Sequence, residues 1–403
     1  MPLFRLFEND SPPTKSAFFQ ARKKIKIQFF EDLFQCTKNV FYQTYNHPKN
    51  SIKKWKGFRL IACDGSGFRV PDNKENRQKI GEHKNQHKTL ASCKIVAFHD
   101  VLNRIFIDIF LHQRSDSELT VVHQNFDKIP KDAIMIYDRA YGDSLLLARH
   151  LKSKKHCIIR MKIGGSNVIK EFIASGKKEA IVTYKIGERS YYSAVKKHGL
   201  KNNFPKFHPF QIRLVRVELD NGVTEVLATT LLDMECYPHE NFKWLYGQRW
   251  GVETAFDEVK NQLKLSLFSG YNYQTVLQDI WAVFIFYNIR SLLIFKAEQE
   301  IEKSIKSDNN IREKVPPKKL NNSKKRKTIH KYQVNRNIAI AIIQTQFFEL
   351  FQRKTMGKAL EWMIKMIKEH KEPIRDRPTR KRVKKVMRSN SRHHTEKNYK
   401  PAF

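Results

Sequence analysis

Cysteine is scarce in this sequence: there are five among 403 residues, and no two lie at Cys-x-x-Cys spacing. A zinc ribbon is therefore disfavoured, and the odd, scattered cysteines do not suggest a disulfide framework. The N-terminus lacks the apolar stretch of a signal peptide, so we expect a reducing cytoplasm. The most hydrophobic segment, 280–295, is interrupted by Asn288 and Arg290. We predict that it is a buried helix and not a membrane span.

Acidic residues are also few, since 40 Asp and Glu stand against 76 Lys and Arg, for a formal charge of +36. Such an excess repels itself unless a polyanion neutralises it, and nucleic acid is the commonest polyanion. A ribosome-associated or merely adhesive basic protein is the alternative. Hydrophobic residues make up 40% and aromatics 12%, enough for a buried core, and the length predicts two to four structural units.

The first 55 residues predict basic helices. Ser16 is placed to cap a helix over 17–25. Four residues continue an apolar face beyond that helix: Phe29, Phe30, Leu33 and Phe34. A role in contacting DNA and an ordinary solvated surface helix are both open for this region.

From residue 57 the pattern changes to short apolar runs, which predict a sheet. The predicted strands are 58–64, 90–99, 104–111, 133–137 and 157–161, and the predicted helices between them are 115–126 and 144–151. Residues 65–67 predict a turn, and 74–88 a basic loop. The order is strand, hairpin, helix, strand, helix, strand. This order predicts an α/β fold with a ribonuclease-H-like mixed sheet and helices on its faces.

The rest of the chain divides by composition. Four runs of β-forming residues, at 180–185, 190–195, 211–219 and 224–231, with a turn at 220–222, predict a β-rich insertion. Helical patterns follow at 241–263, 276–302, 338–351 and 357–370, with a basic linker at 312–331. We expect five units: a helical, basic DNA-binding region (1–55), the first part of the catalytic domain (56–164), the insertion (165–240), further catalytic-domain helices (241–305), and a basic linker, helical region and tail (306–403).

Two carboxylates follow buried strands. Asp64 comes after the strand at 58–64 and Asp138 after the strand at 133–137. Neighbouring strand ends in one sheet can bring such side chains together. Aspartate is also common in turns and helix caps, so neither residue alone indicates a catalytic site.

A polar stripe is predicted on the helix at 241–263. Tyr246, Arg249, Glu253 and Lys260 lie at offsets of three, seven and fourteen residues, which places them within about 60° of one helix face. An exposed face carrying ordinary ion pairs is the alternative. Phosphodiester cleavage by two Mg²⁺ ions needs carboxylate ligands, which Asp64, Asp138 and Glu253 could supply together. The basic residues of the stripe would then face the phosphates.

Three motifs in order resemble a known family. They are Asp-Gly-Ser at 64–66, Asp-Arg-Ala-Tyr-Gly-Asp at 138–143, and Y-x2-R-x3-E-x6-K from Tyr246 to Lys260. Together they resemble the DDE transposases of insertion sequence family four. The resemblance covers about residues 15–300, including Ser-Ala-Phe at 16–18 and Ser-Glu-Leu at 117–119.

The resemblance implies roles for six residues. Asp64, Asp138 and Glu253 would be catalytic and would hold two Mg²⁺ ions, with Mn²⁺ able to substitute. The DNA-binding residues would be Tyr246, Arg249 and Lys260, which would grip phosphates at the ends of the element. Asp143, Asp257 and Glu258 are interpreted as surface or supporting residues.

The resemblance also implies a reaction and its partners. The enzyme would cut double-stranded DNA at inverted-repeat ends and join the freed 3′-hydroxyl to target DNA, as a homodimer on DNA in the nucleoid of a bacterial cytoplasm, with no membrane partner. Family members that form a terminal hairpin stack a flipped base on a Trp of the insertion, yet 165–240 contains no Trp. Four aromatic residues could substitute: Tyr191, Tyr192, Phe204 and Phe207. An end-binding regulator without catalysis and a different nuclease on the same fold are the rival hypotheses.

Overall fold

The computed structural model describes residues 14–45, 51–84, 89–200, 209–219, 222–313 and 332–374, with the side chains of Lys15 and 306–313 excepted. The basic tail from 375, most of the predicted linker, Asp220, Asn221, Phe204 and Phe207 lie outside these ranges. The α-helices are α1 (Lys15–Lys23), α2 (Ile27–Thr44), α3 (Lys74–Lys79), α4 (Glu118–Gln124), α5 (Ser144–Lys152), α6 (Asn167–Ala174), α7 (Glu188–Lys197), α8 (Asn241–Gly247), α9 (Trp250–Asp257), α10 (Tyr273–Glu313), α11 (Arg336–Gln346) and α12 (Met356–Glu369). The π-helix is η5 (Glu258–Gln262), and the 3₁₀ helices are η3 (Phe126–Lys128), η4 (Arg139–Tyr141) and η6 (Phe347–Phe351).

In the described part of the chain, nine strands form one mixed sheet. The strands are β1 (Arg59–Arg69), β2 (Glu82–Lys84), β3 (Thr89–Asp100), β4 (Ile105–Gln113), β5 (Ala133–Tyr137), β6 (His156–Met161), β7 (Glu179–Tyr184), β8 (Phe210–Glu218) and β9 (Thr224–Thr229), with β10 (Tyr332–Val334) and β11 (Lys371–Pro373) in a separate pair. The central order is β4-β3-β1-β5-β6, in which β1, β5 and β6 are parallel and β3 and β4 antiparallel. The predicted ribonuclease-H-like mixed sheet is confirmed.

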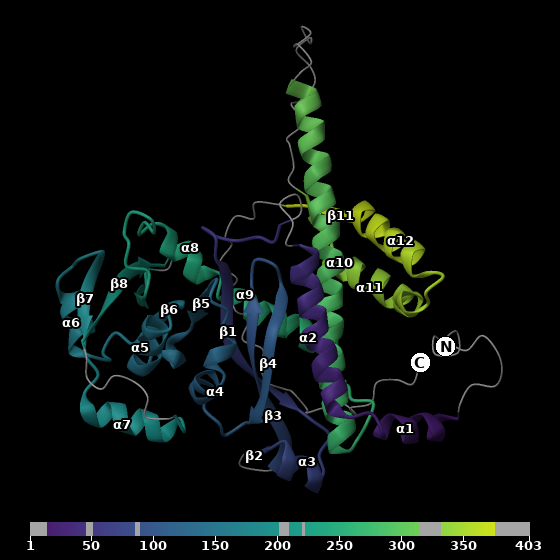
Figure 1. Cartoon of the computed structure of the whole chain (residues 1–403), viewed down its shortest axis with the longest axis horizontal. Coiled ribbons are helices and arrows are strands. Elements are labelled where there is room, and N and C mark those ends of the chain that lie inside the picture. Colours follow the sequence, from purple (N-terminus) through teal and green to yellow (C-terminus); the bar gives the residue numbers. More distant parts are fainter. Residues whose placement is uncertain are drawn as a thin grey trace, which may run out of the picture.

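Alternation along β1 shows why both faces of the sheet are covered. Leu60 and Ala62 belong to one apolar core, while Ile61 and Cys63 belong to another. Successive side chains of a strand point to opposite faces, so a run without polar residues must be buried on both. The first core is closed by α2, α9 and α10 and the second by α4, α5 and α6. Figure 1 shows α2 and α10 side by side along the sheet, with the segment from α6 to β8 at the opposite end.

One predicted strand of the segment 165–240 is wrong. Residues 190–195 belong to helix α7, while the strands predicted around β7, β8 and β9 are confirmed. Within α7, Tyr191 is buried, Ala194 and Val195 are half-buried, and His198 directly after the helix is buried. This inward spacing of three to four residues has the period of a helix, and it outweighs the β preference of the aromatic pair. The burial of Tyr191 also excludes it as an exposed stacking surface, whereas Tyr192 is exposed.

Two local predictions near the N-terminal half are also corrected. Helix α1 begins two residues earlier than expected and is capped by Thr14, not Ser16, because the Thr14 hydroxyl accepts the Ala17 N–H at 3.2 Å. The predicted basic loop contains α3 and β2. Asn73 caps α3, because its side-chain oxygen accepts the Asn76 N–H.

Helix α10 is the hydrophobic segment noted in the sequence. Its stretch Tyr273–Ile305 is long and apolar enough to cross a membrane by length and composition, but 72% of its most apolar window is buried inside the protein. It packs on α2, β4 and α12. Asn288, which interrupts the apolar run, is buried and hydrogen-bonds the backbone of Phe106 on β4 in both directions. The helix is therefore built as a core helix, as predicted.

Candidate catalytic site

Strands β1 and β5 place Asp64 and Asp138 at neighbouring positions. The last parallel pair is Cys63 with Tyr137, so the two aspartates are the next residues on adjacent strands. Asp64 does not end its strand, which corrects the predicted turn at 65–67. β1 continues to Arg69 because its pairing with β3 runs on beyond the end of β5. Both aspartates therefore lie beside the C-terminal end of the central strand β5.

Asp138 begins the short helix η4. Its Oδ1 accepts the Ala140 N–H at 2.6 Å, and the side chain is half-buried. This is the capping role in which a strand-end aspartate is often found. The cap uses one carboxylate oxygen and holds the side chain at the end of β5.

Glu253 comes to the same sheet from α9, which packs on β1 and β3. Phe256 on α9 contacts Phe68 on the extension of β1, with ring centroids 6.1 Å apart. The approach is close, because a Cβ at Gly251 would lie 2.9 Å from the nearest side-chain atom of Val101 in the hairpin turn. A glycine two residues before Glu253 thus lets the helix reach the sheet.

The predicted helix at 241–263 is in fact three consecutive segments, α8, α9 and the π-helix η5. Lys260 lies in η5, where the wider turn changes the angle between successive side chains. Its Nζ lies 4.8 Å from the centroid of the Phe68 ring. Lys260 therefore sits against the same extension of β1 that begins at Asp64.

Charges converge on Asp64. Burial raises the pKa of Asp64 to about 7, the Gly65 amide opposes this, and the negative charges of Glu118 and Glu253 raise the pKa further. Burial lowers the pKa of Lys260, and the negative charge of Asp64 acts against that shift. The same charge helps to raise the pKa of Arg249. The structure thus brings Asp64, Glu253, Arg249 and Lys260 within electrostatic range of one another.

Tyr246 and Arg249 each bury a polar atom that has no partner in the described structure. These atoms are the Tyr246 hydroxyl and the Arg249 Nε. Arg249 also pairs through Nη1 with Glu253 and lies 4.8 Å from the centroid of the Trp250 ring. A buried polar group without a partner costs about 1–3 kcal/mol, so a water or a ligand that accepted these hydrogen bonds would stabilise this part of the site.

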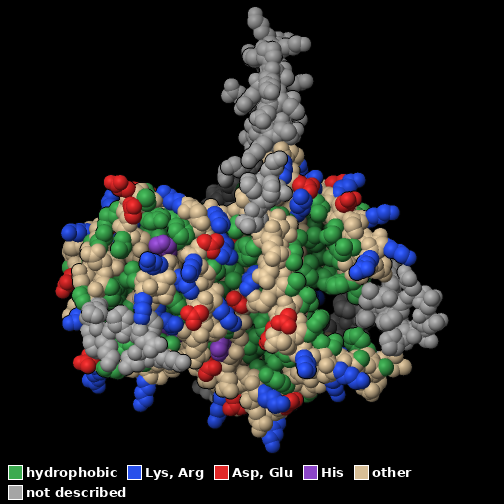
Figure 2. All heavy atoms as spheres, viewed as in Figure 1, with side chains coloured by type: hydrophobic (Ala, Val, Ile, Leu, Met, Phe, Trp, Pro, Cys, Tyr) green, Lys and Arg blue, Asp and Glu red, His purple; other side chains and the backbone are tan. Residues whose placement is uncertain are grey.

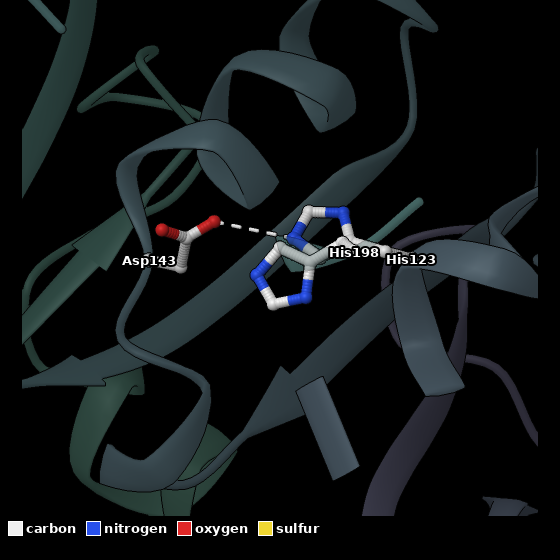
Figure 3. A group of neighbouring side chains, drawn as sticks. All are labelled: His123, Asp143 and His198. Carbon is white, nitrogen blue, oxygen red and sulfur yellow. Dashed lines mark hydrogen bonds and ion pairs between the residues drawn. The ribbon is translucent and has the colours of Figure 1, made fainter. Parts of the chain in front are cut away.

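The three carboxylates suit a hard divalent cation, since their oxygens are the ligands such ions take. They do not form a compact group here. Among the described residues, one set of three His, Cys, Asp or Glu side chains has its ligand atoms within 4.8 Å of one another, and it is His123, Asp143 and His198 (Figure 3).

This second set is already satisfied by hydrogen bonds. Arg149 Nη1 lies 3.1 Å from His123 Nδ1, and a guanidinium only donates, so the proton of His123 sits on Nε2 and is donated to Asp143 Oδ2 at 3.2 Å. His198 Nδ1 lies 2.8 Å from the Thr120 hydroxyl. A protonated Nε2 has no lone pair for a metal, so we interpret the set as a contact that joins α4, α5 and α7.

The three further acids noted in the sequence serve local structure. Asp143 caps α5 by accepting the Leu146 N–H at 3.0 Å, and exposed Asp257 accepts from the Asn261 amide. Glu258 is buried rather than at the surface and pairs with Arg290 of α10 at 2.5 Å.

Sequence reasoning missed Glu118, which the structure places beside Asp64. Two signals were present, its position directly after Ser117 at a predicted helix start and the Ser-Glu-Leu segment at 117–119 within the family resemblance, but neither assigned it to the site. Which strand its carboxylate meets depends on how α4 packs, and the sequence pattern does not contain that information.

The strand order and the carboxylates at the end of β5 define a ribonuclease-H-like catalytic fold. A family model described as "Transposase DDE domain" matches residues 55–289, and the chain belongs to this family. That range contains all six residues of the predicted site.

Two relatives from Escherichia coli K12 are similar in sequence. The transposase InsG of insertion sequence element IS4 is 23% identical over 293 residues, which are 71% of this chain and 62% of that protein. The putative transposase InsZ is 26% identical over 167 residues, 40% of this chain and 54% of that protein. The chain therefore matches less than two thirds of the length of either relative.

A solved structure, a synaptic complex of the piggyBac transposase with hairpin DNA, aligns at a TM-score of 0.39 and 10% identity, over 86% of this chain and 64% of that one. At this TM-score the alignment supports no conclusion about this chain. The assignment of this chain to the DDE transposases of the IS4 family rests on the family match and the two relatives.

Proposed function

We propose that the chain is an active cut-and-paste transposase that cleaves DNA at the inverted-repeat ends of its element and joins them to target DNA. The observation that supports this best is the pair of unpartnered polar atoms on Tyr246 and Arg249, next to Glu253. A phosphate oxygen accepts hydrogen bonds from both a hydroxyl and a guanidinium, and so would satisfy both.

The other residues take roles that follow from their positions. Asp64, Asp138 and Glu253 would hold the metal, proposed to be two Mg²⁺ ions with Mn²⁺ as a substitute. When bound, such ions activate the attacking oxygen and stabilise the leaving one. Lys260, held over Phe68, would neutralise a phosphate beside Asp64.

DNA and metal binding would be coupled through Arg249. In the protein alone, its guanidinium neutralises Glu253. A phosphate that recruits Arg249 would leave the Glu253 carboxylate free to bind a cation, so the site would assemble fully only on DNA.

Basic surfaces outside the site would add affinity that does not depend on sequence. Figure 2 shows Lys and Arg side chains on the lower rim of the visible face, where Figure 1 places α7, α3 and α1. Each of these helices ends in basic residues. We further propose that 1–55 and 306–403 contribute to DNA binding and that the enzyme acts as a homodimer on double-stranded DNA.

The test uses the full chain and a short duplex from the boundary of its own element, in Mg²⁺, Mn²⁺ or Ca²⁺. We expect nicking in Mg²⁺ and Mn²⁺ but not Ca²⁺. Asp138→Ala and Glu253→Gln should abolish cleavage and leave end binding largely intact. Glu361→Gln, an exposed acid on α12, is the matched control and should cut normally. Tight binding without cleavage in every metal would instead identify an end-binding regulator.

A further inference from the structure

Glu118 extends from the first turn of α4 onto strand β1. A Cβ built on Gly65 would lie 2.3 Å from the Glu118 carboxyl carbon and 2.6 and 2.7 Å from its two oxygens. No residue larger than glycine leaves room for that carboxylate at this position. Gly65 directly follows Asp64, so the contact places a fourth acid beside the first carboxylate of the site.

The same carboxylate also contacts the turn that holds the second aspartate. Glu118 Oε2 accepts the hydroxyl proton of Tyr141 at 2.9 Å, and Tyr141 is fully buried in η4, the helix that Asp138 caps. The other oxygen pairs with Lys94 on β3 at 3.3 Å. Glu118 therefore links β1, β3 and the turn after β5 at the point where Asp64 and Asp138 meet.

The negative charge at this position is needed for the ion pair with Lys94 but not for the hydrogen bond with Tyr141. A glutamine could accept the Tyr141 hydroxyl equally well, and its neutral amide would not repel Asp64 and Glu253. Close carboxylates destabilise one another unless a positive charge lies between them. Lys94 pairs with Glu118 and Arg249 with Glu253, while Asp64 has no ion pair of its own among the described residues. The arrangement is favourable when a cation is bound.

We propose that Glu118 is a positioning residue of the catalytic site whose charge strengthens divalent cation binding at Asp64 while its bond to Tyr141 fixes the Asp138 turn. The inference rests on the proposed function, because it assigns Glu118 to the same metal site. A role only in starting α4 is the competing explanation, since an acid in the first turn also stabilises a helix.

Three variants of the full chain separate charge from position. Glu118→Gln keeps an acceptor for Tyr141 and removes the charge. Tyr141→Phe keeps the charge and removes the hydroxyl. Gly65→Ala keeps every charge, but its methyl group would occupy the place of the Glu118 carboxylate. Glu361→Gln is again the matched control.

The first readout is Mn²⁺ affinity without DNA, from the electron paramagnetic resonance signal of free Mn²⁺. We expect Glu118→Gln and Gly65→Ala to weaken binding by about tenfold, as is usual when a residue supporting metal ligands is lost. Tyr141→Phe should bind Mn²⁺ nearly as well as wild type but cut more slowly at saturating Mn²⁺. Raising Mn²⁺ should restore much of the cleavage by Glu118→Gln, which a merely structural defect would not allow.

Wild-type Mn²⁺ affinity in Glu118→Gln and Gly65→Ala would overturn the proposal while the proposed transposase function stands. A wild-type chain that binds no Mn²⁺ and cuts no DNA would instead refute both. If Glu118→Gln does not fold, as judged by its melting temperature, Gly65→Ala alone decides the question.

Discussion

Asp64→Asn should make the metal-free protein more stable at neutral pH. The folded protein holds the pKa of Asp64 at about 7 against an ordinary value of 3.8, chiefly because the side chain is buried. A difference of about three pKa units, at about 1.4 kcal/mol each, corresponds to a penalty of about 4 kcal/mol once the group is ionised. Asparagine has nearly the same shape and does not ionise, so the variant avoids this penalty.

The direction of the pKa shift determines the pH range in which the penalty applies. Because the folded-state pKa is raised, the penalty is absent below pH 3.8, grows as the pH rises towards 7, and is complete above pH 7. The free energy of unfolding of the variant should therefore exceed that of wild type by about 4 kcal/mol at pH 8 and by less than half of that at pH 5.

Urea unfolding at both pH values, with a chelator present, measures this difference. In a second measurement without the chelator, added Mn²⁺ should stabilise wild type and not Asp64→Asn, because the ion binds the folded state through the carboxylate. Equal stabilities of the two proteins at pH 8 would refute the reasoning, and so would a difference that does not change with pH. Glu361→Gln should show no pH-dependent difference from wild type.

Two more substitutions test the charge pairs around the site. Arg249→Met should bind Mn²⁺ without DNA several-fold more tightly than wild type, because it frees Glu253, and should bind end DNA more weakly. Titrations with Mn²⁺ and with DNA measure the two affinities. If both affinities rose or both fell, Arg249 would not exchange Glu253 for a phosphate. Glu258→Gln should lower the free energy of unfolding by about 3–5 kcal/mol, because it leaves Arg290 buried without a counter-charge. Glu258→Leu combined with Arg290→Leu should recover most of that loss in urea unfolding, and no recovery would show that the charge itself was not the cause.

The sequence by itself determined the elements that are strongly patterned. The run at 133–137 is apolar throughout because β5 is covered on both faces, and its bounds match the prediction. The order of elements around Asp64 and Asp138 implied that their strands are neighbours. The spacing of the four motif residues from Tyr246 to Lys260 predicted a shared helix face, because helix periodicity is a local property, and their proposed roles came from the resemblance to the family signature.

Only the tertiary structure decided how far β1 extends and what lies beside it. A Gly-Ser-Gly segment predicts a turn locally, but pairing with β3 holds it as a strand, and the glycine makes room for Glu118. Likewise, α7 is a helix because Tyr191 and His198 are buried together on one side. Contacts between residues far apart in the chain override weak local preferences, and no pattern within a short window records them.

The pairing of charges was also decided by packing. Two glutamates of one helical stretch have different partners. Glu253 lies near Asp64, while Glu258, five residues later, is buried and pairs with Arg290. The π-helix that begins at Glu258 changes the direction of the following side chains and puts Lys260 over Phe68. A regular helix was the only geometry the sequence could supply, so it predicted which residues share a helix face but not which partners each of them meets.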